Sequence, residues 1–462
     1  MILIKGVIGL DQKSNTLLVE DAVVKNNQVE NDSVETIDNR TRVKALVASA
    51  IGSSIEWYDF FLYGTMSALV FNKIFFPSDD PYISLMLTYA SFALAFFVRP
   101  LGGVLFSHIG DRIGRKKTLI ITLSIMGGST VAMGLLPNYQ TVGLLAPILL
   151  IVLRLLQGLS LGGEWGGGLL LAVEYAPKKK RGFYGSIPQI GAMIGISLAS
   201  LSASLLTNLL SEEAFLSYGW RIPFIASVVL VVVGLWIRNG VGETPSFKKV
   251  ASSGNTVKVP LFETMTKHWR AVLTTIGAKF VETSTFFIFA TFTISYAVGT
   301  LGYDNSTVLN GILIAAILAI PIMMLVGAIS DRIGRKKMFM AGTIAIFLYA
   351  IPYFWILSFK TTFALTLAIV IGFAIIWPMY GAILGTLFAE SFSANVRYTG
   401  ISLGYQIGAA VVGGPAPLIA TALLANYNNN YVAVGIFIML AAIVSLVAIL
   451  FTRDMTGRDL DD

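Results

Sequence analysis

Ionisable side chains stand inside long apolar stretches of this chain, where a charge is difficult to accommodate. Glu56 and Asp59 are three residues apart, and so are Lys279 and Glu282. Residues at positions i and i+3 lie on the same face of a helix, so each pair shares a face. In the middle of a membrane such a side chain is costly unless it is paired or hydrated, and it therefore predicts a functional site.

Asp59 and Arg154 are the residues that we expect to couple proton movement to a conformational cycle. A carboxylate beside an arginine stays ionised, whereas one left in apolar surroundings takes up a proton more readily. If the two groups separate and meet again during the cycle, a proton is loaded and released. A static buried ion pair is the alternative, and Glu56 is a second candidate for the proton carrier.

The remaining charged positions are candidates for binding a ligand. Arg99 is suited to a carboxylate, which a guanidinium binds through two hydrogen bonds, although a structural charge near the membrane edge is the alternative. Lys279 and Glu282 either neutralise each other or take part in binding. Glu164 lies in the glycine-rich stretch 158–168. Small residues allow close helix approach, which leaves Glu164 available to a cavity or to a neighbouring helix.

Neutral side chains complete the candidate binding set. Gln189 and Gln406 offer hydrogen bonds to a polar ligand, and both stand near prolines and glycines that bend helices. Tyr63, Trp377 and Tyr380 are candidates for the wall of a cavity, and ordinary packing is the alternative for each of them.

The composition places these residues in a membrane. The chain has 462 residues, of which 55% are hydrophobic and 13% are charged, whereas a soluble domain has roughly 25% charged residues. There is no cysteine and there are two histidines, which disfavours disulfides, metal sites and histidine-led catalysis. We therefore expect no cofactor and no enzyme activity. The net charge of +7 comes from short clusters between apolar runs, which indicates membrane topology and no nucleic-acid partner.

Twelve apolar runs have the length of a membrane-spanning helix, for which roughly 20 residues suffice. They lack the alternation of barrel strands, so we expect an all-α polytopic membrane protein. The predicted spans are 43–71, 83–107, 118–137, 143–173, 183–209, 222–238, 270–299, 307–329, 338–358, 362–388, 398–425 and 431–452.

The distribution of basic residues predicts the orientation of these spans. Connections after odd-numbered spans carry only Lys73, Arg221 and Lys360, and the even-numbered connections carry the other loop lysines and arginines. By the positive-inside rule the even-numbered connections and both termini are cytosolic. The predicted parts are a disordered N-terminal tail, a six-helix half, a linker, a second six-helix half and a C-terminal tail. Their bounds are 1–42, 43–238, 239–269, 270–452 and 453–462.

The two halves repeat each other in sequence. DRIGRKK occurs at 111–117 and again at 331–337, an offset of 220 residues. EYAPKKKR at 174–181 is echoed by ESFSANVR at 390–397, with Glu and Arg seven residues apart both times. Matched motifs at a nearly constant offset indicate an internal duplication. In transporters built from such repeats, the substrate site lies near the midplane between the halves.

Twelve spans in two halves, with G-x-x-x-D-R-x-G-R-K-K after spans two and eight, resemble the major facilitator superfamily. The second copy fits fully, and the first has Ser107 in place of the leading glycine. Within that superfamily the chain is similar to the metabolite–proton symporters over residues 43–452. The stretches that carry this similarity are EWYDFFLYG, FVRPLGGVLFSHIGDRIGRKK and RLLQGLSLGGEWGG.

The resemblance implies a gate on the cytosolic side, where the heptad joins neighbouring helix ends. The acidic residues of the heptad accept hydrogen bonds from arginines or from a helix N-terminus, and its arginines bind carboxylates of the neighbouring loop. The gate opens when these pairs separate. Plain anchoring of the spans by positive charge is the alternative. The gate residues are Asp111, Arg112, Arg115, Glu174 and Arg181 in the first half, and Asp331, Arg332, Arg335, Glu390 and Arg397 in the second.

We expect a secondary transporter of the plasma membrane that moves a small carboxylate-bearing metabolite together with protons. The resemblance implies alternating access and a single chain as the complete transport unit, with the lipid bilayer, protons and the small molecule as partners. The alternatives are symport of a zwitterion such as proline or betaine, an uncoupled uniporter, and a sugar carrier of the same superfamily.

Overall fold

The computed structural model describes residues 39–113, 115–162, 169, 172–173, 176–240, 261–392, 396–452 and 454–457. These residues form helices and connecting turns, and no strand occurs among them. Residues 1–47 and 48–462 are two compact units. Of the first unit the structure describes residues 39–47, which begin helix α2, so most of the predicted tail 1–42 lies outside the described residues.

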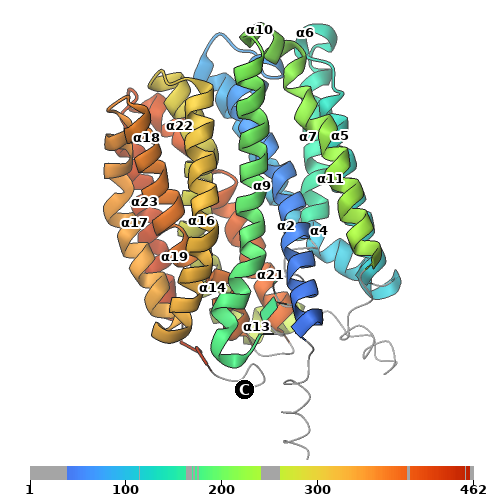
Figure 1. The fold of residues 1–462 in the computed structure, drawn as a ribbon, viewed down its shortest axis with the longest axis vertical. Helices are drawn as coiled ribbons and strands as arrows, with labels where there is room; N and C mark the ends of the chain where they lie inside the picture. The colour runs from blue at the N-terminus through green and yellow to red at the C-terminus, as the bar shows by residue number, and fades with distance from the viewer. Residues whose placement is uncertain are drawn as a thin grey trace, which may run out of the picture. The chain divides into compact units, whose positions relative to one another are not determined.

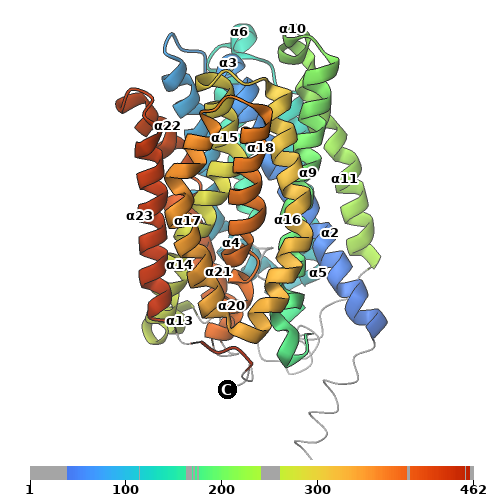
Figure 2. The same ribbon diagram turned by 60° about the vertical axis from the view of Figure 1, so that its left-hand side comes forward.

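Long helices make up most of the described chain, and Figures 1 and 2 show them running side by side. The long helices are α2 (Asn39–Met66), α4 (Pro81–Ile113), α5 (Arg115–Gly134), α7 (Leu145–Leu161), α9 (Arg181–Leu209), α11 (Arg221–Gly240), α14 (Trp269–Phe287), α16 (Asn305–Ile333), α17 (Arg335–Leu357), α21 (Arg397–Gly408), α22 (Ala416–Asn426) and α23 (Tyr431–Leu450).

Short helices and π-helical turns connect or extend the long ones. The α-helical and 3₁₀ pieces are α3 (Asn72–Ile74), α6 (Tyr139–Val142), η2 (Lys178–Lys180), α10 (Glu212–Ala214), α13 (Leu261–Lys267), α15 (Thr293–Ser295), α18 (Thr362–Ile369), α19 (Pro378–Gly381) and α20 (Leu384–Ser391). The π-helical turns are η1 (Ser67–Phe71), η3 (Phe215–Gly219), η4 (Ile288–Phe292), η5 (Tyr296–Thr300), η6 (Val370–Ile376) and η7 (Ala409–Gly413).

Each of the twelve predicted spans falls on a helical segment. Nine segments of the described chain are long and apolar enough to cross a membrane, or ten if the bent pair Glu212–Gly219 and Arg221–Ile237 counts as one span. The other two predicted spans are α2 and α7, and α7 is described only to Leu161. The prediction of an all-α polytopic membrane protein is therefore confirmed.

Glycines bring α4 and α7 into backbone contact, as the small-residue stretches predict. A Cβ atom on Gly102 would lie 1.9 Å from the carbonyl oxygen of Leu159, and one on Gly162 would lie 2.0 Å from that of Arg99. In lipid, where burial of apolar side chains gives no advantage over contact with acyl chains, such close approach drives helix association. It also fixes the depth of Arg99 within the bundle.

The outer helices present apolar side chains outward, whereas α14 is an interior helix. Leu101, Trp236 and Phe363 are more than 60% exposed, as expected for residues that face lipid. The most apolar part of the segment Trp269–Thr300, which begins with α14, is 94% buried, against 39% for the segment Asn305–Ile333. The charges of α14 are thus surrounded by protein.

Helices α9 and α16 join the two predicted halves, and both views show them side by side. At one end of this pair Gly182 of α9 meets Gly327 of α16. A Cβ atom on Gly182 would lie 2.5 Å from the carbonyl oxygen of Gly327, so only hydrogen fits there. We call this end of the bundle, where Asp331–Arg335 joins α16 to α17, the heptad end, and the other end the far end.

Candidate functional site

A small cavity lies among side chains from both predicted halves. The space between them has room for about one water molecule, so a metabolite enters only when side chains or helices move apart. The lining residues are Trp57, Phe96, Arg99, Gln189, Ala192, Lys279, Glu282, Thr283, Phe286, Phe287, Trp377, Tyr405 and Ala409. Five of the predicted binding residues are among them: Arg99, Gln189, Lys279, Glu282 and Trp377.

Arg99 enters this cavity from α4 between aromatic rings. Its guanidinium carbon lies 4.8 Å from the ring centre of Phe60 and 4.7 Å from that of Phe96. Its Nε and Nη2 atoms have no hydrogen-bond partner among the described residues. Ring faces attract the cation but leave its hydrogen-bond donors free, so Arg99 is suited to binding an anion.

Lys279 and Glu282 of α14 lie on one helix face, as their spacing predicts, and form an ion pair in the cavity lining. The ammonium of Lys279 also lies 3.6 Å from the ring centre of Tyr405 on α21. The hydroxyl of Thr283 donates to Glu282 Oε2 over 2.7 Å. Both charged side chains are buried, so these protein contacts stabilise the pair.

The aromatic residues predicted for the cavity wall divide between the cavity and the packing around it. Trp377 lines the cavity, and its Nε1 donates to the backbone oxygen of Glu282 over 2.9 Å. Tyr380 instead bonds the hydroxyl of Thr285 at 2.9 Å. Tyr63 bonds the hydroxyl of Ser91 at 2.7 Å and is not among the lining residues. Tyr63 and Tyr380 are therefore packing residues in this structure.

Gln189 lines the cavity from α9. The other predicted amide, Gln406, lies outside the lining. Its Nε2 donates to the backbone oxygen of Gly162 at 3.5 Å, and its Oε1 has no partner among the described residues.

Beside the cavity a second polar cluster surrounds Arg154. Its Nη1 donates to Gln157 Oε1, and Gln157 Nε2 donates to the hydroxyl of Thr130 at 2.9 Å. The guanidinium carbon lies 4.2 Å from the ring centres of both Phe60 and Tyr63. The ring of Phe60 is thus shared by Arg154 and the cavity arginine.

Asp59 is fully buried and lies beside the hydroxyl of Thr130. Neither of its carboxylate oxygens has a hydrogen-bond partner within the described part of the chain. No ion pair joins Asp59 to Arg154, whose donor goes to Gln157 instead. The predicted pair is therefore apart in this structure, and polar side chains lie between its members. Glu56, the rival candidate, is also buried.

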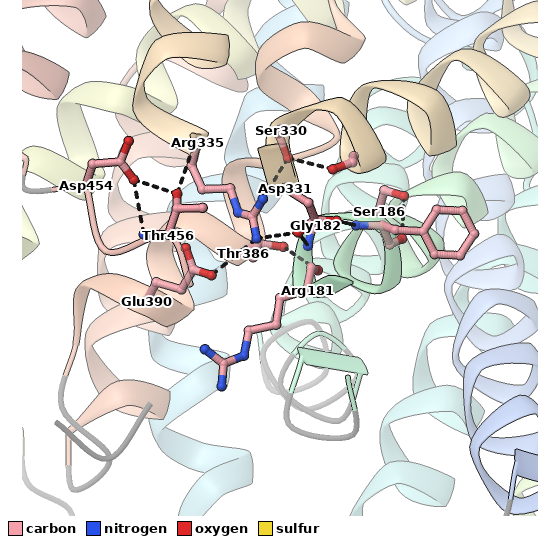
Figure 3. A network of polar contacts seen from close by, with 12 residues as sticks. Arg181, Gly182, Ser186, Ser330, Asp331, Arg335, Thr386, Glu390, Asp454 and Thr456 are labelled. Atoms are coloured by element: carbon pink, nitrogen blue, oxygen red, sulfur yellow. Dashed lines mark hydrogen bonds and ion pairs between the residues drawn. The ribbon is translucent and has the colours of Figure 1, made fainter. Parts of the chain in front are cut away.

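At the heptad end a network of polar contacts ties α16 to α9 (Figure 3). The carboxylate of Asp331 accepts from the backbone N–H groups of Gly182 at 2.9 Å and Phe183 at 3.1 Å. Both N–H groups belong to the first turn of α9, where no acceptor within the helix is available, so Asp331 caps a helix of the other predicted half and complements its dipole. The hydroxyl of Thr386 donates to the backbone oxygen of Arg181 at 3.4 Å and adds a second link.

Arg335 lies at the centre of the same network (Figure 3). Its Nη2 bonds Asp331 at 2.7 Å and Glu390 at 3.4 Å, and it is fully buried. Its backbone N–H donates to the hydroxyl of Thr456, which in turn donates to Asp454, so the C-terminal segment caps α17. The predicted Arg335–Glu390 pair is present, and the carboxylate that bridges the halves is Asp331.

Two predicted gate arginines have other surroundings. Arg332 is exposed and forms no ion pair with any residue that the structure describes. The Nε of Arg397 donates to the backbone oxygens of Ala389 and Phe392 at 2.9 and 3.2 Å, which closes the turn between α20 and α21. Within the described part of the chain Arg332 does not show the expected pairing, and these hydrogen bonds of Arg397 close a turn instead. Five other predicted residues cannot be placed, because the described part of the chain does not include Glu164, Glu174 or the side chains of Asp111, Arg112 and Arg115.

The sequence prediction missed several residues of the site. Gln157 stands three residues after Arg154, so the i, i+3 spacing was a usable signal. Three missed lining residues belong to aromatic runs, whose pattern is equally typical of core packing; they are Trp57, Phe286 and Phe287. The resemblance implied that a heptad carboxylate accepts from a helix N-terminus, but not that Asp331 would cap α9, because this contact joins segments 149 residues apart and no local pattern identifies the partner.

Comparisons with known proteins identify the family. The model of the Major Facilitator Superfamily matches residues 49–413, which is most of the chain. The chain belongs to this superfamily. Its twelve-helix fold and its character as a multi-pass membrane transporter, not an enzyme, are therefore established.

Three proteins similar in sequence to this chain are described as transporters. The shikimate transporter of Escherichia coli strain K12 is 38% identical over 416 residues, covering 89% of this chain and 94% of its own. The inner membrane metabolite transport protein YhjE of the same strain is 42% identical over 91% of this chain and 96% of its own. The proline/betaine transporter of that strain is 34% identical over 92% and 86%. The resemblance to metabolite transporters of this superfamily is thus confirmed.

Among solved structures, that of a D-xylose-proton symporter superposes with a TM-score of 0.70. It covers 90% of this chain and 99% of its own at 17% identity, which supports the fold alone.

Proposed function

We propose that this protein is a proton-coupled symporter for a small carboxylate-bearing metabolite. The observation that carries the proposal is the charge of the cavity lining. The lining side chains include two cations, Arg99 and Lys279, and one carboxylate, Glu282, which gives the lining a net charge of +1, and the carboxylate of Glu56 is buried outside this lining. A monocarboxylate cargo would neutralise this charge, and buried charges are stable only when they are neutralised. The guanidinium donors without partners among the described residues supply the hydrogen bonds for it.

Asp59 is the proposed proton carrier. A buried carboxylate without hydrogen-bond donors is stable only as the neutral acid, and this is the environment of Asp59 among the described residues. Hydrogen bonds connect Thr130, beside Asp59, through Gln157 to the guanidinium of Arg154, and within the described part of the chain no hydrogen bond joins the carboxylate of Asp59 itself to them. Movement that brings Arg154 to Asp59 would favour the carboxylate and release the proton. Glu56 stays a second candidate because it lies on the same helix, one turn earlier.

The heptad-end network is the proposed inner gate. Positive-inside charge supports a cytosolic location for this end and for both termini. Contacts of Asp331 with α9 hold the two halves together there, and their loss would open the cavity to the cytosol. A single chain contains both halves and the whole cavity, which supports a monomer as the transport unit.

Zwitterion symport is the second candidate, and Glu282 is the observation that favours it. A zwitterion would place its carboxylate on Arg99 or Lys279 and its cationic group beside Glu282. The relatives support both possibilities, since one is a shikimate transporter and another is a proline/betaine transporter.

Transport by purified protein in proteoliposomes tests the proposal. Shikimate, proline, glycine betaine and D-xylose are added outside in turn, while a trapped dye reports the internal pH and labelled cargo reports uptake. Internal acidification with shikimate alone supports the carboxylate, and acidification with proline or betaine supports the zwitterion. Uptake of labelled cargo without any pH change refutes symport and supports a uniporter.

Replacement of Asp59 by Asn separates the proton carrier from the rest of the mechanism. We expect Asp59→Asn to lose accumulation against a gradient while it keeps exchange of labelled for unlabelled cargo, since exchange needs no net proton movement. If Asp59→Asn still accumulates cargo, Asp59 is not the carrier, and the same pair of assays on Glu56→Gln identifies the rival.

A further inference from the structure

We infer that Glu282 occupies the place of the cargo carboxylate on Lys279 between transport cycles, and that cargo binds by displacing it. The inference rests on the proposed function, because it requires a carboxylate cargo in the cavity. It assigns to Glu282 a role in release and selectivity that simple charge neutralisation does not include.

The first support is the position of the pair. Lys279 and Glu282 both line the cavity, and their side chains are 1% and 8% exposed. Glu282 therefore presents to Lys279 the same chemical group that the proposed cargo carries. It does so from within the space that the cargo must enter.

The second support is that the two side chains are held in different ways: Lys279 has packing and ring contacts besides Glu282, whereas the carboxylate of Glu282 contacts a hydroxyl and the ammonium itself. A Cβ atom on Gly408 would lie 2.6 Å from the Cβ of Lys279, so the backbone of α21 packs directly on this lysine. Its ammonium lies against the ring of Tyr405. For Glu282 the anchored part is the backbone, which accepts from Trp377. Its carboxylate is held by Thr283 and Lys279, both of which can exchange it for another anion.

Displacement follows from the charges. Two carboxylates beside one ammonium in an apolar cavity repel each other, so an entering carboxylate and Glu282 compete for Lys279. Arg99 in the same lining offers the entering anion a second cation, which favours the exchange. Glu282 thus lowers the affinity for a plain anion and speeds its release. For a zwitterion the displaced Glu282 meets the cationic group, so the same residue favours binding.

Binding of two probes to the purified full chain tests this inference. Shikimate serves as the anion and glycine betaine as the zwitterion, and calorimetry gives the Kd of each for wild type and Glu282→Gln. We expect Glu282→Gln to bind shikimate about tenfold more tightly, a change of about 1.4 kcal/mol, and to bind glycine betaine more weakly. Its shikimate uptake per unit protein should fall because release becomes slow.

The matched controls use the same chemical change elsewhere and the partner residue. Glu212→Gln alters an exposed glutamate at the far end and should leave both Kd values unchanged. Lys279→Gln should abolish tight shikimate binding in both the wild-type and the Glu282→Gln background. If Glu282→Gln does not fold, the Kd values are measured for Glu282→Asp in its place. A carboxylate on a side chain one methylene shorter weakens the pair with Lys279, so this variant should bind shikimate more tightly than wild type, by less than the change expected for Glu282→Gln.

The outcomes distinguish the inference from the proposed function. If wild type binds shikimate and Glu282→Gln binds it equally or less tightly, the inference is overturned while carboxylate symport stands. If wild type neither binds nor transports any member of the panel, the proposed function fails and the inference fails with it.

Discussion

Replacement of Asp331 by Asn is the sharpest test of the gate. Asparagine has the shape of aspartate and keeps one acceptor oxygen, but it removes the charge that faces the N-terminus of α9. Asp331 makes two hydrogen bonds across the predicted halves, to the N–H groups of Gly182 and Phe183. Its bond to Arg335 lies within the second half and stays in place when the halves separate.

The magnitude follows from those two bonds. A hydrogen bond to a charged group contributes ~1.5–3 kcal/mol and one between neutral groups ~0.5–1.5 kcal/mol, so loss of the charge costs about 1 kcal/mol at the bond that keeps an acceptor oxygen. The other N–H bonds the second carboxylate oxygen, which becomes an amide NH2 in asparagine, so that bond is lost and costs at least as much. Together they give at least about 2 kcal/mol, which shifts the equilibrium between closed and open gate roughly 30-fold or more toward open.

Thiol labelling measures this shift directly. The natural chain has no cysteine, so one introduced cysteine gives an unambiguous signal. Ser186 on α9 is fully buried near Gly327 and suits a Ser186→Cys reporter. We expect a maleimide to label this cysteine at least roughly 30-fold faster in the Asp331→Asn background than in the parent.

The control is Asp304→Asn, the same change on an exposed residue at the other end of α16. It should leave the labelling rate unchanged. An equal rate in Asp331→Asn and the parent would refute the argument that this carboxylate holds the halves together. Faster labelling in both variants would point to general loosening of α16 and refute it equally.

Two further predictions concern the second polar cluster and the far end. Gln157→Leu removes the acceptor of buried Arg154, which should cost ~1–3 kcal/mol and lower the unfolding temperature in detergent, while Gln157→Glu should restore it; an unchanged midpoint for Gln157→Leu contradicts the role. Lys73 lowers the pKa of Glu212, so their pair stabilises the fold above the usual pKa of a glutamate, and this contribution is lost as the pH falls through the lowered value. Because both side chains are exposed, Glu212→Gln should shift the unfolding temperature at neutral pH by no more than ~2 °C, and a larger drop would show a structural role.

Local patterns were sufficient to predict the spans, the glycine contacts and the placement of Lys279 and Glu282 on one helix face, where pairing with each other was one of two alternatives. Each depends on residues within a turn or two of one helix, or on small side chains that leave one packing outcome. The Arg335–Glu390 pair was also predicted, because the duplicated sequence marked both residues.

The other contacts depend on how the helices pack against one another. Arg154 was expected to pair with Asp59, but its hydrogen-bond acceptor is Gln157, three residues away on the same helix. Tyr63 and Tyr380 were expected at the cavity, but each turns to a hydroxyl on a neighbouring helix, Ser91 and Thr285. A sequence gives the polar groups, and the rotation of each helix about its axis decides which of them meet.

The contact between Gly182 and Gly327 has a mechanical consequence. With no side chain on either residue, the halves meet as bare main chain, and a Cβ atom on either glycine would lie 2.5–2.6 Å from the opposite carbonyl oxygen. A side chain can relieve a close contact by changing rotamer, but a backbone cannot, so the halves cannot approach further once these two backbones touch. A contact of this kind is either fully formed or fully broken, which favours an abrupt transition between closed and open states over gradual opening.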